Sequence, residues 1–75
     1  PLGYKKFAQL YDAMGEQQLS HLNFGIYHEL REENDDAINE YNAALQYKKD
    51  DVETIKRLAE LHEKLNEPEF AADYY

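Results

Sequence analysis

Residues 32–45 read EENDDAINEYNAAL, in which an acidic opening passes without a break into small, aliphatic and aromatic side chains. Ala37, Tyr41 and Ala44 recur at intervals of four and three residues, so they share one face of a helix. Two helix axes approach to about 8–10 Å only where small residues leave room for large ones beside them. The stretch therefore predicts a helix that packs small residues against large ones.

The acids at the start of this stretch resemble part of a calcium loop. Such a loop places oxygen ligands at alternate positions over about twelve residues, with a glycine in the middle and a closing glutamate. Here the helical pattern begins after five residues, and the stretch contains no glycine. We expect Asn34 to cap the helix and Asp35 and Asp36 to occupy its first turn, where the helix dipole stabilises carboxylates.

The rest of the chain has the same helical spacing, and no period-two alternation is long enough to predict a strand. We expect helices near residues 2–14, 17–31, 34–48, 52–65 and 68–75. Gly15 is placed to end the first of them. Because the links are only a few residues long, consecutive helices must pack as antiparallel hairpins. The predicted fold class is all-α, an α-hairpin solenoid of about five antiparallel helices.

A comparison of the chain with itself indicates a repeat of 34 residues. The positions that are identical at this offset are His28 and His62, Glu29 and Glu63, Glu33 and Glu67, Ala37 and Ala71, and Tyr41 and Tyr75. The large and small pair Phe24 and Gly25 falls on Leu58 and Ala59. The coincidences therefore include positions that are expected to pack helices together.

A large and small pair on one helix, followed by Ala-x-x-x-aromatic-x-x-Ala on the next, resembles a tetratricopeptide repeat. The resemblance implies a complete repeat at 18–51, an incomplete repeat at 52–75 and a partial preceding repeat or cap helix at 1–17. The repeat packing residues that it implies are Phe24, Gly25, His28, Ala37, Tyr41, Ala44, Leu58, Ala59, His62, Ala71 and Tyr75. Residues 58–75 are also similar to the carboxyl-terminal repeats of a tetratricopeptide subunit of the anaphase-promoting complex, a multi-subunit ubiquitin ligase.

The sequence departs from the tetratricopeptide pattern at single positions. His28 and His62 stand where tyrosine is usual, and we expect their ring nitrogens to find local partners. Glu32 replaces the usual loop glycine, and Lys49 stands where a proline often ends the second helix. None of these changes alters the spacing of the pattern.

Composition excludes several classes of function. The 75 residues carry 16 acids against 8 bases, a net charge of −8 that repels nucleic acid and anionic membranes. There is no cysteine, which excludes disulfides and fits an intracellular protein, cytoplasmic or nuclear. One serine and no glycine-rich phosphate loop predict no enzymatic activity and no cofactor. We also expect no metal site, because His21 and His28 are seven residues apart on one helix.

Four residues are candidates for contact with a protein or peptide partner: Asn23, Lys56, Arg57 and Tyr47. Some tetratricopeptide domains hold a carboxyl-terminal peptide with lysines, asparagines and arginines, and Asn23 and Arg57 match that set. Glu53 stands where this clamp needs a lysine and would repel the carboxylate, so the clamp is not expected. Lys56 and Arg57 are expected to line a concave groove, and Tyr47 falls outside the apolar stripe of its helix.

These observations predict a non-enzymatic scaffold for protein–protein interaction, an excerpt of a larger tetratricopeptide protein. Arrays of this type usually need three or more repeats for stability. A first alternative is therefore a helical module that self-associates through its end helices. A second alternative is an acidic module that binds cations.

Overall fold

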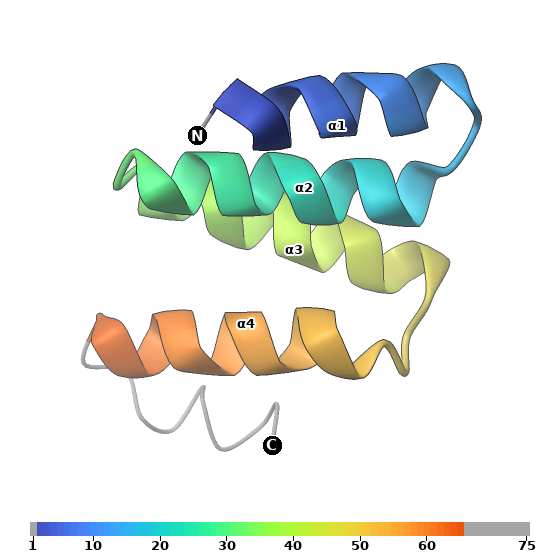
Figure 1. Ribbon diagram of the computed structural model, residues 1–75. Helices are drawn as coiled ribbons and strands as arrows, with labels where there is room; N and C mark the ends of the chain where they lie inside the picture. Colours follow the sequence, from blue (N-terminus) through green and yellow to red (C-terminus); the bar gives the residue numbers. More distant parts are fainter. Residues whose placement is uncertain (1, 66–75) are drawn as a thin grey trace.

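The computed structural model describes residues 2–65, which form four helices joined by short links (Figure 1). They are α1 (Leu2–Ala13), α2 (Gln17–Leu30), α3 (Asn34–Tyr47) and α4 (Val52–Lys64). The described part is all-α, as predicted, and each helix ends one residue before its predicted end. The fifth predicted helix, near 68–75, lies outside the described residues, as do Ala71 and Tyr75. None of the four helices is long and apolar enough to cross a membrane.

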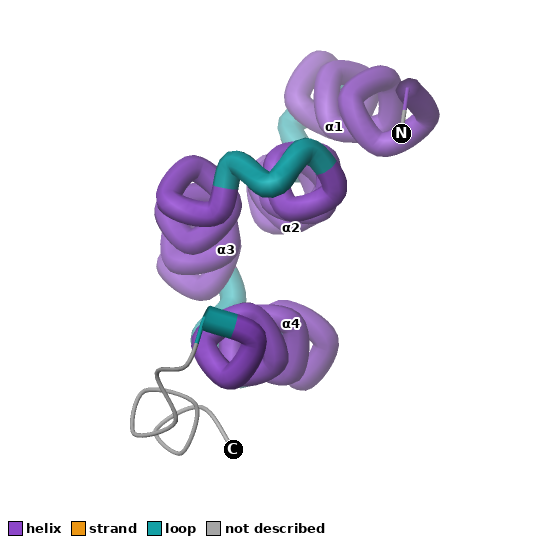
Figure 2. Tube along the Cα trace, turned by 90° about the vertical axis from the view of Figure 1, so that its left-hand side faces the viewer, coloured by secondary structure: helices purple, strands orange, loops and turns teal. Residues whose placement is uncertain are grey.

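Helices that are consecutive in the chain pack against each other and run antiparallel (Figure 1). Viewed along the helix axes, α2 lies between α1 and α3, and α3 contacts both α2 and α4 (Figure 2). The helices α2 and α4 lie on the same side of α3, so the chain bends around that side (Figure 2). The molecule is elongated, with extents of 36 × 25 × 15 Å.

The α1–α2 link shows why the first helix ends at Ala13, one residue before its predicted end. Gly15 has a φ of +81°, in the left-handed region that glycine adopts without a steric cost. Its N–H donates to the carbonyl of Asp12 at 3.0 Å, and the N–H of Glu16 donates to that of Tyr11 at 2.8 Å. This pair of bonds is a Schellman motif, which satisfies the last carbonyls of α1.

The α2–α3 link has the same geometry with a different residue at its centre. Glu32 takes the left-handed position with a φ of +61°. The N–H of Glu32 donates to the carbonyl of Glu29 at 3.0 Å, and the N–H of Glu33 donates to that of His28 at 2.9 Å. The turn therefore forms although Glu32 replaces the usual loop glycine. The conformational cost is about 1–2 kcal/mol, because Glu32 carries a Cβ.

The predicted cap of α3 is wrong by one residue. Glu33 occupies the N-cap position, and Asn34 is already helical. The buried Oδ1 of Asn34 accepts no hydrogen bond within the described residues. The reason is that Glu33 also closes the Schellman motif of α2, so the next helix starts directly after it. The Glu33 side chain meets Nδ1 of His28 at 2.8 Å instead, and this hydrogen bond is the main cause that lowers the pKa of Glu33. Asp35 and Asp36 lie in the first turn, as predicted.

The core is centred on Tyr41, which is fully buried between α2 and α4 neighbours. A Cβ atom added to Gly25 would lie 2.5 Å from Cε1 of Tyr41, so only glycine leaves room for the ring. Of the other packing candidates within the described residues, Phe24 and His28 are half-buried, and those that are buried are Ala37, Ala44, Leu58, Ala59 and His62.

The α1–α2 contact is built differently, from small and polar residues. Ala8 is fully buried, and the hydroxyl of the buried Ser20 donates to the backbone carbonyl of Ala8 at 2.8 Å. On its other side α1 exposes Phe7 and Leu10, and Met14, directly after the helix, is exposed as well. One face of α1 therefore packs against α2, and an apolar face is exposed.

Candidate functional site

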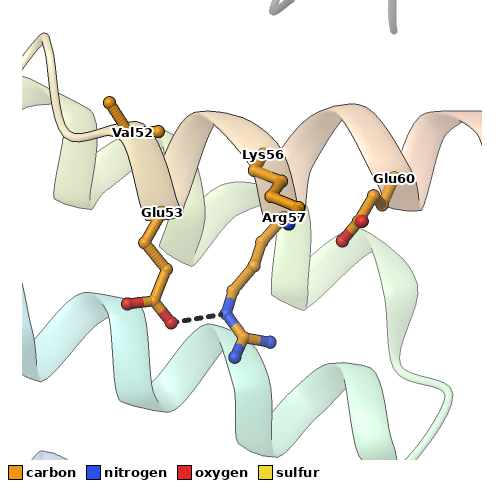
Figure 3. A pocket seen from close by; sticks show the side chains of 5 residues that line it. All are labelled: Val52, Glu53, Lys56, Arg57 and Glu60. Carbon is orange, nitrogen blue, oxygen red and sulfur yellow. Dashed lines mark hydrogen bonds and ion pairs between the residues drawn. The ribbon is translucent and has the colours of Figure 1, made fainter.

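An open hollow of about 410 Å³ lies along one face of α4. Its lining residues are Val52, Glu53, Lys56, Arg57 and Glu60 (Figure 3). They recur at the spacing of one helical face, and Glu53 and Arg57 extend from α4 toward α2 (Figure 3). The hollow therefore opens on the side of the molecule where α2 and α4 both lie.

Arg57 is the most enclosed charge of the hollow. Its Nε donates to Oε2 of Glu53 at 3.2 Å, across one turn of helix (Figure 3). The side chain of Arg57 is 33% exposed, against 58% for Glu53. Burial alone lowers the pKa of Arg57, but the hydrogen bond with Glu53 and the nearby Tyr41 outweigh it and leave the pKa raised. The guanidinium is therefore always charged and partly neutralised by its own helix.

The hollow connects to the core through Tyr41. The Tyr41 hydroxyl donates to Oε1 of Glu29 at 2.7 Å. Burial and this carboxylate raise the pKa of Tyr41, and the positive charge of Arg57 opposes the shift. The phenol is therefore neutral at any physiological pH. A chain of polar contacts thus runs from Glu29 of α2 through Tyr41 to Arg57, which lines the hollow.

Two of the four predicted contact residues lie together in the hollow. Lys56 and Arg57 both line the hollow. Asn23 does not line it. The Nδ2 of Asn23 donates to the backbone carbonyl of Leu19 at 2.8 Å, one turn earlier in its own helix. That bond occupies one of the two N–H donors of its half-buried side-chain amide.

Tyr47 lies away from the hollow, at the end of α3. Its side chain is exposed, and its ring stacks on that of His21 with centroids 5.7 Å apart. The same histidine meets Oε1 of Glu40 at 2.7 Å through Nδ1. The imidazole of His21, on α2, therefore contacts both the carboxylate of Glu40 and the ring of Tyr47, which lie on α3.

Three other residues line the hollow that were not predicted from the sequence to do so: Val52, Glu53 and Glu60. The signal that could have found them is their spacing, because they share the polar face of α4 with Lys56 and Arg57. Two bases lie between two acids along this face, and no lining residue is a serine, threonine, cysteine or histidine. The arrangement suits the binding of a segment that carries both signs of charge.

Comparison of the chain with models of protein families, with curated proteins and with solved structures found no match.

Proposed function

We propose that the chain is a tetratricopeptide-type scaffold that binds a segment of another protein in the hollow of α4 and carries out no chemistry of its own. The observation that supports this function best is the position of Arg57, a partly buried charge that interacts with Glu53 and Tyr41 and lines an open hollow. The antiparallel hairpins and the Gly25–Tyr41 contact support the fold resemblance on which the proposal rests.

The charges of the hollow define the kind of segment that it accepts. Arg57 is already paired with Glu53, so the exposed ammonium of Lys56 is the first group to attract a carboxylate of the partner. Glu60, one turn after Lys56, attracts a base. A segment with an acid and a base close together in its sequence therefore complements the hollow, whereas an all-acidic segment meets repulsion from Glu53 and Glu60.

A random-peptide display library selected on the immobilised chain tests the proposal. We expect the selected peptides to shift the amide resonances of α2 and α4, and Lys56→Glu to weaken their binding at least about tenfold by reversing a charge in the hollow. Lys49→Glu is the matched control, because it makes the same change on an exposed residue in the α3–α4 link. A failure to select any peptide, or an equal loss with both variants, would contradict the proposed function.

A second candidate function is self-association, and the exposed apolar face of α1 favours it. Phe7 and Leu10 of α1 are 55% and 62% exposed, and Met14, directly after the helix, is 66% exposed. In this case a dilution series should shift resonances on α1 instead of those on α2 and α4, and light scattering should show a mass that rises with concentration. A monomer at every concentration would exclude self-association.

A further inference from the structure

Three side chains with metal-ligating atoms meet at the α2–α3 link. They come from the end of α2 (His28), from the link itself (Glu33) and from the first turn of α3 (Asp36). One ligand atom from each lies within 4.8 Å of the other two, and Nδ1 of His28 is 2.8 Å from Oε1 of Glu33. The spacing of the histidines predicted no metal site, because the histidines do not converge, whereas here one histidine lies close to two carboxylates.

The fold of the link explains why these residues meet. The Schellman motif turns the chain back on α2, so that the backbone N–H of Glu33 bonds to the carbonyl of His28 at 2.9 Å. Asp36 follows Glu33 by three residues, at the start of the same helix, and such positions are neighbours on a helix surface. Backbone hydrogen bonds therefore hold the attachment points of all three side chains in place before any ion binds.

We propose that His28, Glu33 and Asp36 bind a divalent transition-metal ion of the zinc class. One imidazole and two carboxylates are ligands that zinc accepts, whereas magnesium and calcium prefer oxygen ligands alone. Ligand atoms about 2.1 Å from a tetrahedral zinc ion lie about 3.4 Å apart. Nδ1 of His28 and Oε1 of Glu33, which are 2.8 Å apart, therefore need to open slightly to admit the ion between them. Asp36 is exposed and can rotate to close the site. Three protein ligands leave one position for water.

Arg31 is the one described cation that competes for this site, and it contacts the opposite oxygen of Glu33. Its Nε lies 3.3 Å from Oε2 of Glu33, whereas Oε1 faces His28. An exposed ion pair of this kind contributes little free energy. The ion therefore takes the place of the hydrogen bond between His28 and Oε1 and leaves the Arg31 contact with Oε2 in place, and removal of Arg31 should tighten its binding.

Calorimetric titration of the metal-free chain with zinc chloride tests the proposal. We expect one ion per chain and weaker binding of magnesium chloride under the same conditions. His28→Gln and Asp36→Asn should each weaken zinc binding at least about tenfold, because loss of a supporting contact alone typically costs 10–100-fold. Arg31→Ala should tighten it. Cobalt should bind with the visible absorption of a site that contains nitrogen and oxygen ligands.

His21→Gln is the matched control. It removes the imidazole of the other histidine–carboxylate pair, which has no third ligand among the described residues. Circular dichroism of each metal-free variant checks the fold, and Asp36→Asn keeps the test decisive if His28→Gln does not fold, because Asp36 is exposed. The proposal is overturned if zinc does not bind, if magnesium binds as tightly, or if His21→Gln weakens binding as much as His28→Gln.

Discussion

The hairpins α1–α2 and α2–α3 have the same connection but different interfaces. In both, the N-cap residue of the second helix has nearly the same backbone angles, φ −86° and ψ 74° at Glu16 and φ −89° and ψ 70° at Glu33. The left-handed residue before it is glycine in one link and Glu32 in the other. Across the α2–α3 interface Gly25 accommodates a buried tyrosine ring, whereas the α1–α2 interface contains Ala8 and a serine.

This difference separates two contributions to a helical hairpin. The link sets the antiparallel direction of the two helices. It can form even when the residue in its left-handed position carries a Cβ, as Glu32 does. The interface sets how firmly the two helices hold together, because it excludes water from large side chains. We therefore expect substitutions in the interface of α2–α3 to have larger effects than substitutions in either link.

The largest effect is expected at Gly25. Gly25→Ala should lower the free energy of unfolding by about 2 kcal/mol, because overpacking of a core costs about 1–3 kcal/mol. The new methyl group would lie 2.5 Å from the Tyr41 ring, which is fully buried and hydrogen-bonded to Glu29. Urea denaturation measures the change. In a Tyr41→Leu background the same substitution should cost much less, and an equal cost in both backgrounds would reject the close contact as the cause.

Gly15→Ala tests the first link. The φ of +81° is unfavourable for any residue with a Cβ, so we expect a loss of about 1–2 kcal/mol in thermal denaturation. No atom lies within 4 Å of the added Cβ, so this cost is conformational and does not come from a clash. Ala13→Gly, in the last turn of α1, is the control for a change of helix propensity alone. A melting temperature unaffected by Gly15→Ala would argue against the left-handed turn.

Ser20→Ala tests the α1–α2 interface. Its buried hydroxyl donates to the Ala8 carbonyl, and loss of such a bond costs about 0.5–1.5 kcal/mol. Hydrogen exchange should become faster in α1 and stay unchanged in α3, because the bond joins only α1 and α2. Faster exchange in all four helices would show that the two hairpins unfold as one unit.

The smallest effect has the opposite sign. Glu32→Gly should raise the free energy of unfolding by about 0.5–1 kcal/mol, because glycine adopts the φ of +61° without strain but loses more entropy on folding. Glu32→Ala is the control: it removes the charge, keeps the Cβ and should leave stability nearly unchanged. Stabilisation by both variants would point to the charge of Glu32 instead of its backbone.

Helical periodicity predicted where the described helices lie, because a helix is closed by hydrogen bonds between residues four apart. It did not predict the start of α3 correctly, since the cap depends on how Glu33 also closes the preceding helix. Asn23 shows the same limit for the candidate site. Its residue type suited partner contact, but the folded helix provides an acceptor one turn away.

Local sequence thus determined the helices, the short antiparallel links and the small residues on the face of α3. Only the tertiary structure decided which residues of different elements meet: Tyr41 packs on Gly25, Arg57 lies near Tyr41, and His28 lies close to two carboxylates. The physical reason is that these contacts depend on the register of one helix against another. That register is set by turn geometry and close packing together, and neither can be read from one helix alone.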